Sequence, residues 1–341
     1  MSADALLPPG HTPTPRRKRR PWLIALIAVV VLALLAAGGV ALYAWNLGHS
    51  FDTKTHKIAK VFPSETARPP SPTGAAAQAQ NILLMGSDTR GSVNGSLSNI
   101  SAQRSDTIMV MHIPANRQHV YVVSIMRDSW VDIAGHGQAK VNAALSYGGV
   151  PLAVQTIEGM LGARIDHVAL IDFEAFKGLT NALGGVTINN PIAFSSSFTK
   201  GETFPAGPQH INGSQALDFV RERYAFPDGD FQRVKDQQIF LKAVMDSALS
   251  VNTLSDPGRV SKMINTVAPY LAVDSGFNAG YLAGLAVEMR NVRAKDISFF
   301  SAPTSGTGTS DDGQSIVNVN WDKLAVLKKA FQTDTLDTYQ P

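Results

Sequence analysis

Cysteine is absent from all 341 residues of the chain. Its absence excludes a disulfide scaffold, a zinc site built on thiolates and a cysteine nucleophile. The absence of cysteine does not indicate whether the compartment is oxidising or reducing, because many exported bacterial-type domains fold without disulfides. Charged residues are also few, at 17%, whereas the hydrophobic fraction is 44%. This balance is typical of a globular protein with an added apolar segment.

Several common site motifs are also missing. The eight histidines are scattered and form no HExxH pair, so no zinc site is predicted. The sequence contains neither a GxSxG elbow nor a Walker loop. The pair Gly184 and Gly185 is interpreted as a helix stop, and His112, inside an apolar run, as a core histidine. Serine-elbow hydrolases, P-loop enzymes and zinc enzymes therefore find no support.

Positive charge is concentrated at the N-terminus. Five basic residues at positions 16–20 oppose the single Asp4, which gives residues 1–20 a net charge of +4. Because the whole chain carries +3, the remainder carries −1. Residues 1–20 are also rich in proline, and we expect a disordered basic tail there. The remainder lacks the bulk charge that favours nucleic acid, so no nucleic-acid partner is predicted.

An apolar run follows the basic block. Residues 21–45 contain no Asp, Glu, Lys or Arg, and about 20 apolar helical residues are enough to cross the hydrocarbon core. We therefore expect a transmembrane helix over 21–45 in a single-pass protein of the cell membrane. By the positive-inside rule, the tail is cytoplasmic and the C-terminal domain is extracytoplasmic. A cleaved signal peptide is the alternative, because Ala36, Ala37 and Ala41 resemble a cleavage region.

The chain beyond this run divides into a connecting region and one domain. We expect a juxtamembrane segment and linker over 46–80, including a short helix at 52–62, and a single domain over 81–341. Apolar, strand-like runs lie at 81–86, 107–113, 119–126 and 167–173. Helices are predicted at 151–161, 174–183, 230–249, 280–288 and 321–331. This mixture indicates a layered α/β fold.

Charged residues converge where the first strands end. The loop 114–118 is short, so the second and third strands are predicted to form an antiparallel hairpin. If the first strand is antiparallel to the second, three charged segments meet at one edge of the sheet. The residues of that edge are Asp88, Arg104, Asp106, Arg127 and Asp128.

A second charged group surrounds the start of the 230–249 helix. In an extended segment, Arg221 and Arg223 would point to the same side. On the helix, with Asp230 as N-cap, Arg233 and Gln237 are four residues apart and share a face. Carboxylates suit Mg²⁺, and the arginine fork suits phosphate oxygens. The two groups together favour a phosphate site, with surface salt bridges as the alternative.

Several motifs occur in the order known for one protein family. They are NILLMGSDTR (81–90), RSDTIMVMHI (104–113), VYVVSIMRDSWV (120–131), KVNAALSYGG (140–149), ALGGVTI (182–188), VRERY (220–224) and DFQRVKDQQ (230–238). Through these motifs the chain resembles the LytR-CpsA-Psr family of cell-envelope glycopolymer transferases. The resemblance covers about residues 80–250.

The resemblance implies a fold and an activity. The expected fold is an α/β/α sandwich with a mixed central sheet. The expected activity is that of a phosphotransferase in cell-wall assembly. It moves a glycopolymer, such as a teichoic acid or a capsule, from a polyprenyl-pyrophosphate carrier to peptidoglycan. Pyrophosphatase activity is implied as a side reaction, and Mg²⁺, replaceable by Mn²⁺, as cofactor.

The resemblance also implies roles for individual residues. The implied metal ligands are Asp88 and Asp106. The implied catalytic residues are Asp88, Asp106, Arg127 and Arg221. The implied substrate-binding residues are Arg104, Arg127, Arg221, Arg223, Arg233 and Gln237.

Two positions depart from the family pattern. Met126 stands where the family has proline, and Asp236 stands where it has arginine. The second change replaces a cation by an anion on the helix that is predicted to bind phosphate. It leaves open an alternative function, a non-catalytic binder of lipid-linked envelope precursors or peptidoglycan.

Overall fold

The computed structural model describes the backbone of residues 21–87 and 105–341, and the side chains of 37–86 and 105–341. Asp88 and Arg104 lie outside these residues. The chain forms two compact units, Met1–Asn46 and Leu47–Pro341. Helix α1 (Pro21–Lys54) begins in the first unit. Within the described residues, no helix is both long and apolar enough to cross a membrane.

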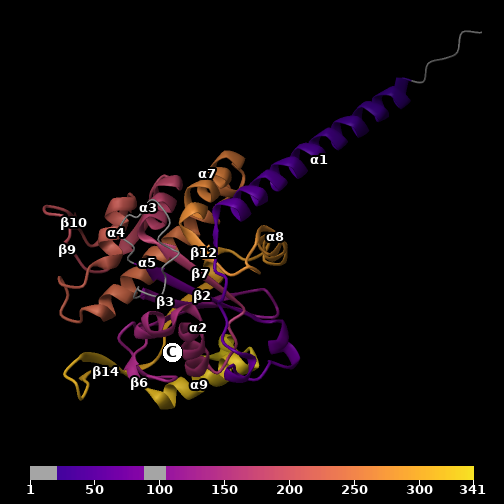
Figure 1. The fold of residues 1–341 in the computed structure, drawn as a ribbon. Helices are drawn as coiled ribbons and strands as arrows, with labels where there is room; N and C mark the ends of the chain where they lie inside the picture. Colours follow the sequence, from indigo (N-terminus) through magenta and orange to yellow (C-terminus); the bar gives the residue numbers. More distant parts are fainter. Residues whose placement is uncertain (1–20, 88–104) are drawn as a thin grey trace, which may run out of the picture. The chain divides into compact units, whose positions relative to one another are not determined.

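A mixed central sheet forms the middle of the second unit (Figure 1). Among the described residues its strand order is β1 (His56–Lys57), β12 (Leu271–Val273), β7 (His167–Asp172), β2 (Gln80–Ser87), β3 (Ser105–Ile113), β4 (Val120–Ile125) and β13 (Ile297–Ser301). Strand β3 is antiparallel to both β2 and β4, whereas β2 pairs in parallel with β7. The predicted hairpin and the assumed direction of the first strand are both confirmed.

Helices cover both faces of this sheet, because alternate residues of its buried strands face opposite sides. Leu83 and Val110 pack in one core cluster with residues of α2 (Ala143–Leu161) and α9 (Trp321–Thr333). Leu84 and Met109 pack on the other side, against α5 (Asp230–Ala248). The predicted three-layer arrangement, with a mixed sheet in the middle, is present.

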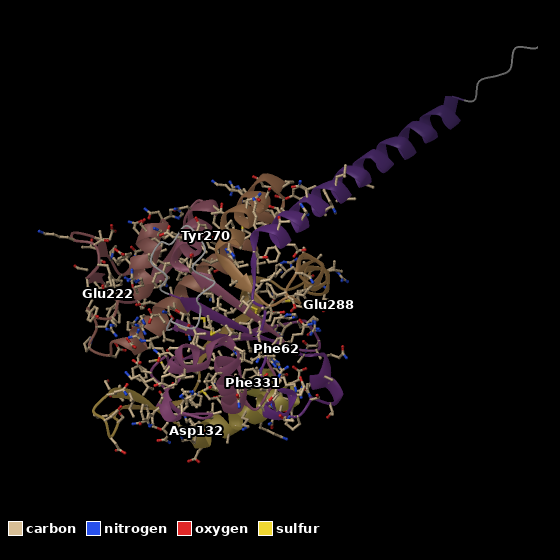
Figure 2. The ribbon with its side chains drawn as sticks, in the orientation of Figure 1. Phe62, Asp132, Glu222, Tyr270, Glu288 and Phe331 are labelled. Carbon is tan, nitrogen blue, oxygen red and sulfur yellow. The ribbon has the colours of Figure 1, made fainter. Side chains whose placement is uncertain are left out.

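A smaller lobe extends from the α5 side of the sheet. Its paired strands are β8 (Val186–Asn190) with β11 (Gly207–Ile211), and β9 (Phe194–Ser195) with β10 (Thr203–Phe204). Its helices are α3 (Phe173–Ala182) and α4 (Gly213–Arg221). Phe194, Phe204, Phe219 and Phe226 bring their rings together in its core, with centroids 4.8–5.7 Å apart. Figure 2 labels Glu222, which follows α4, and Phe331, which belongs to α9 across the sheet.

The remaining elements lie around this framework. The hairpins are β5 (Trp130–Ile133) with β6 (Gly137–Lys140), and β14 (Thr304–Thr309) with β15 (Ser315–Val319). The remaining α-helices are α6 (Val251–Leu254), α7 (Pro257–Val267) and α8 (Ala279–Glu288). Helix α2 begins earlier than predicted, because helical residues precede a kink at Gly148 and Gly149.

The region 46–80 contains more regular structure than the sequence predicts. The prediction of a helix at 52–62 is wrong, because α1 ends at Lys54 and strand β1 begins at His56. β1 pairs with β12 at the edge of the central sheet. From Leu47 onward, this region belongs to the same compact unit as the following domain.

Helix α5 buries an unusual carboxyl group. Asp236 is fully buried, and its Oδ1 accepts a hydrogen bond from Gln232 Nε2 at 2.8 Å. Its Oδ2 has no hydrogen-bond partner among the described residues. Burial raises the pKa of Asp236 to about 7, and the nearby charge of Asp228 acts in the same direction. The folded protein therefore favours the neutral acid at this position.

Replacing Asp236 by asparagine should flatten the dependence of stability on pH. The folded protein holds the Asp236 proton up to about pH 7, whereas an unperturbed carboxyl loses it near 3.8. The wild-type free energy of unfolding should therefore lose up to about 1.4 kcal/mol per pH unit between these values. Asp236→Asn removes this contribution while keeping an oxygen for Gln232. Urea unfolding from pH 4 to pH 8 measures it, and parallel curves for the two proteins would contradict it.

Candidate active site

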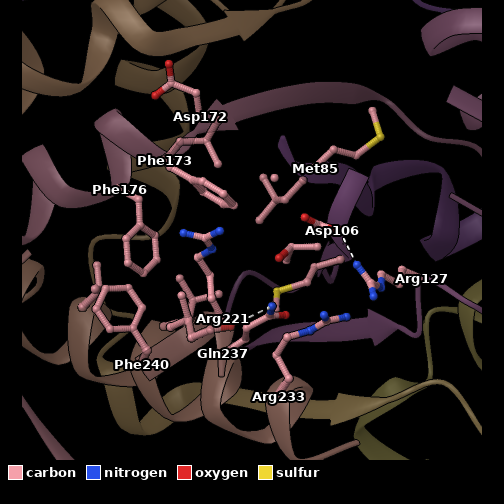
Figure 3. A pocket seen from close by; sticks show the side chains of 18 of the residues that line it. Met85, Asp106, Arg127, Asp172, Phe173, Phe176, Arg221, Arg233, Gln237 and Phe240 are labelled. Carbon is pink, nitrogen blue, oxygen red and sulfur yellow. Dashed lines mark hydrogen bonds and ion pairs between the residues drawn. The ribbon is translucent and has the colours of Figure 1, made fainter. Parts of the chain in front are cut away.

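A cavity of about 440 Å³ lies on the α5 side of the sheet (Figure 3). Its floor comes from β2, β3 and β7, and its walls come from α3, α4 and α5. Charged side chains gather in one part of the lining and apolar side chains in the rest. The polar lining comprises Asp106, Thr107, Arg127, Asp172, Arg221, Arg223, Tyr224, Arg233 and Gln237.

Arg127 is bound by carboxylates from three segments of the chain. Its Nη1 lies 2.5 Å from Asp106 Oδ1, and its Nε lies 3.1 Å from Asp230 Oδ2. Asp128 Oδ2 is 3.7 Å from the same Nε. Burial alone would lower the pKa of Arg127, but the three carboxylates outweigh it and raise the pKa above its usual value. Its cation is therefore held in place over the pocket.

Asp230 connects three arginines. Besides Arg127, it contacts Arg233 Nη2 at 2.9 Å through Oδ2 and Arg223 Nη1 at 3.6 Å through Oδ1. Burial opposes ionisation of Asp230, yet the three guanidinium groups lower its pKa below the usual range. Asp230 is the first residue of α5 and not its N-cap, which is Gly229, so that part of the prediction is wrong. Its contact with the arginines is a site feature that the sequence reasoning missed.

Arg233 has a different environment. Its side chain is 7% exposed, and Nε has no hydrogen-bond partner among the described residues. Burial lowers its pKa, and the neighbouring charge of Arg127 lowers it further. Gln237, one turn later, lines the same cavity and donates from Nε2 to the carbonyl of Val220 at 3.3 Å. The predicted shared face of Arg233 and Gln237 is confirmed.

Arg221 is held by aromatic rings. The condition of an extended segment through Arg221 and Arg223 is not met, because Arg221 is the last residue of helix α4. Its guanidinium carbon lies 5.0 Å from the ring centre of Phe173 and 4.6 Å from that of Phe198. Within the described part of the chain, no carboxylate forms an ion pair with it. Its N–H donors are therefore not committed to a charged partner there.

The structure brings six of the predicted site residues to this one cavity. They are Asp106, Arg127, Arg221, Arg223, Arg233 and Gln237. Asp88 and Arg104 lie outside the described residues. Asp128 does not line the cavity and pairs with Lys140 at 3.4 Å. The two departures from the family pattern, Met126 and Asp236, are also absent from the lining, and Met126 packs in a small apolar cluster with Val317.

The apolar part of the cavity was not predicted. It is lined by Leu84, Met109, Ala169, Phe176, Phe240 and Leu241, among others. Figure 3 shows Phe176 and Phe240 on the opposite side of Arg221 from Arg127. In the sequence such residues cannot be told from core residues, because both kinds follow the same strand and helix periodicity. The cavity thus combines an anion-binding part with a hydrophobic part.

One carboxylate is suitably placed for a hard cation. Asp106 is partly exposed at the cavity, with a side chain accessibility of 31%, and Oδ2 is free of ion pairs among the described residues. No group of three or more Asp, Glu or His residues that could hold a metal occurs in the described segments. Mg²⁺ commonly uses only one or two carboxylates, together with substrate phosphates and water. The donor chemistry at Asp106 therefore fits such an ion.

Several known proteins are similar to this chain in sequence. A TagU transferase from Bacillus mycoides, "Polyisoprenyl-teichoic acid--peptidoglycan teichoic acid transferase TagU", is 32% identical over 70% of this chain and 74% of its own length. The Enterococcus faecalis protein of the same name is 30% identical over 91% of this chain and 95% of its own.

Solved structures agree with these relatives. The crystal structure of Bacillus subtilis TagV is 26% identical and covers 77% of this chain and 99% of its own, with a TM-score of 0.63. The structure "TagT bound to LI-WTA" is also 26% identical and covers 81% and 99%, with a TM-score of 0.61.

The model of the LytR_cpsA_psr family matches residues 45–333, which include every element of the sheet and every residue of the cavity. The chain belongs to the LytR-CpsA-Psr family.

Proposed function

We propose that this protein is a phosphotransferase that moves a glycopolymer from a polyprenyl-pyrophosphate carrier to peptidoglycan. The observation that carries the proposal is the two-part cavity. An arginine cluster suits a pyrophosphate, and the adjoining apolar lining suits the hydrocarbon chain attached to it. The names of the relatives, which specify polyisoprenyl-linked teichoic acid and peptidoglycan, support the same assignment.

The proposed reaction forms one bond to phosphorus and breaks another. A hydroxyl oxygen of peptidoglycan attacks the phosphorus that carries the polymer. The bond from that phosphorus to the bridging oxygen breaks, the hydroxyl proton is lost, and the lipid phosphate leaves. The product is a phosphodiester between polymer and peptidoglycan. When water takes the place of the hydroxyl, the same displacement gives pyrophosphatase activity.

The arginines supply most of the electrostatic stabilisation in this proposal. Negative charge moves onto the bridging oxygen as the bond breaks, and fixed guanidinium groups stabilise it without reorganising. Arg127 and Arg233 are fixed by Asp230, and Arg221 has donors available for a phosphate. We propose Asp106 and Asp88 as the ligands of Mg²⁺, which Mn²⁺ can replace. The ion would neutralise phosphate charge.

Substituting Arg221 is the cleanest test of this assignment. Arg221 has no carboxylate partner among the described residues, so Arg221→Ala leaves no carboxylate there without its counter-charge. Release of lipid phosphate should fall by about 100-fold or more, because a charge-stabilising donor is lost. Release is measured with a defined lipid-linked donor and a peptidoglycan acceptor, with and without Mg²⁺.

The control for that test is Arg259→Ala. Arg259 is about half exposed, and its one ion pair among the described residues is with Asp256, also on the surface. This variant should retain wild-type turnover. Wild-type turnover in a folded Arg221→Ala protein would refute the role of Arg221.

A substitution at Ala169 tests whether the apolar part of the cavity binds the lipid chain. It lies on β7 and lines the cavity, so Ala169→Phe should fill space that the lipid chain would occupy. Donors with long prenyl chains should lose more turnover than donors with short chains, because only the long chains need the blocked space. Equal losses for both donors would contradict lipid binding here. A thermal melt shows whether the larger side chain disturbs folding.

We also propose that residues 21–45 anchor the protein in the cell membrane, with the following domain outside the cytoplasm. The absence of cysteine permits a direct test with single introduced thiols. In intact cells, a membrane-impermeant maleimide should label Ser71→Cys and should fail to label Ser2→Cys until the cells are opened. Labelling of both sites in intact cells, or of neither, would overturn this topology.

No observation favours the alternative of a non-catalytic binder. Its support in the sequence was Asp236, on the helix that carries Arg233 and Gln237. Asp236 does not line the cavity, and its only hydrogen-bond partner among the described residues is Gln232. The change of charge at this position therefore leaves the cluster of arginines at the cavity intact.

A further inference from the structure

A buried glutamate lies between two of the cavity arginines in the sequence. Glu222 is fully buried, and it forms no ion pair with Arg221, Arg223 or any other described residue. It caps the C-terminus of α4, where the helix dipole disfavours negative charge. Burial also opposes its ionisation, yet hydrogen bonds from neighbouring donors lower its pKa below the usual range. This carboxylate is stabilised by its donors and not by a cation.

Those donors come from two separate segments. The first is the turn after α4, in which the backbone N–H groups of Arg223, Tyr224 and Ala225 donate to Oε1 at 2.9, 2.8 and 3.2 Å. The second is the loop between β9 and β10. There Ser197 donates from its backbone N to Oε2 at 2.6 Å and from Oγ to Oε1 at 3.0 Å. One carboxylate therefore joins the β9–β10 loop to the turn at residues 222–225, the arginine turn.

The β9–β10 loop carries Phe198. The backbone N–H of Phe198 donates to Ser196 Oγ at 3.1 Å, and Ser196 Oγ donates to Asp218 Oδ2 at 3.0 Å. The Phe198 side chain is 41% exposed, so packing alone holds it loosely. Its ring nevertheless lies 4.6 Å from the guanidinium carbon of Arg221. The position of this ring depends on the loop, and the loop is tied down at Ser197.

Arg221 in turn depends on its rings. Arg127 and Arg233 are fixed by the carboxylate of Asp230, and Arg221 has no such partner among the described residues. A ring that contacts a guanidinium through its π face leaves the N–H donors, which lie in the guanidinium plane, free to bind an anion. An arginine fixed by rings thus stays available for phosphate, whereas a bound carboxylate would compete for the same donors.

We propose that Glu222 is a positioning residue: by fastening the β9–β10 loop to the arginine turn, it keeps Phe198 against Arg221 and so directs the Arg221 guanidinium toward the pyrophosphate. Phe198 acts in the same chain of contacts. This inference rests on the proposed function and extends it to two residues outside the predicted set.

A double-mutant cycle tests the proposal, with Glu222→Gln, Phe198→Leu and the double variant in the full-length protein. Affinity for inorganic pyrophosphate, measured by calorimetry, is the readout, because it does not require turnover. Each single variant should bind about tenfold more weakly, as expected for loss of a cation–π contact and its orientation. The double variant should also lose about tenfold and not a hundredfold, because both changes break one chain of contacts.

Two further variants separate positioning from general stability. Phe198→Tyr keeps the aromatic face and should keep wild-type affinity. Glu158→Gln removes another buried carboxylate, which binds Arg68 and the backbone N–H of Ile165 away from the cavity. It should lower the melting temperature and leave pyrophosphate affinity unchanged.

The outcomes distinguish this inference from the proposed function. Wild-type affinity in Phe198→Leu or Glu222→Gln, or losses that multiply in the double variant, would overturn the positioning role. Equal losses in Phe198→Tyr and Phe198→Leu would also overturn it. Failure of the wild-type protein to release lipid phosphate would instead refute the proposed function. The pyrophosphate affinities of the variants would still test the positioning role, because they do not depend on turnover.

Discussion

The carboxylate of Asp230 holds the charged part of the cavity together. Three guanidinium groups, from Arg127, Arg223 and Arg233, lie within 3.6 Å of its oxygens. Without that charge, three cations in a partly buried space would repel one another, and screening is weak there. The arginines come from a strand end, a turn and a helix. Asp230, at the first position of α5, is the point at which these separate segments meet.

The central sheet determines what adjoins this cluster. Because β3 is antiparallel to both β2 and β4, the end of β4 and the start of β3 lie at one edge, which brings Arg127 to Asp106. The face of the same strands that turns toward α3 and α5 is apolar. A ligand bound to the arginines therefore has a hydrocarbon surface beside it. The edge of the sheet thus supplies charged groups to the cavity, and one face of the same sheet supplies its apolar lining.

Much of this arrangement could be predicted from the sequence, and the failures have physical causes. Short turns and apolar runs give the strands and the hairpin, and the hairpin gives the meeting of Asp106 with Arg127. The backbone between Arg221 and Arg223 could not be inferred, because two arginines two residues apart are compatible with either a strand or a helix end. The contacts of Asp230 depend on tertiary structure. The apolar lining follows the same periodicity as the core.

Two buried carboxyl groups near the arginine turn have pKa values that are shifted in opposite directions by their surroundings. Glu222 and Asp236 are both fully buried. Glu222 receives hydrogen bonds from two segments, and its pKa is lowered, whereas Asp236 receives one, from Gln232, and its pKa is raised to about 7. Several donors lower the pKa of Glu222 despite its burial, whereas a single donor does not offset burial at Asp236, where the charge of Asp228 raises the pKa further. Asp236 does not line the cavity, and burial favours the neutral form of its side chain. At Glu222 the lowered pKa favours the carboxylate, which accepts the five hydrogen bonds that join the loop and the turn.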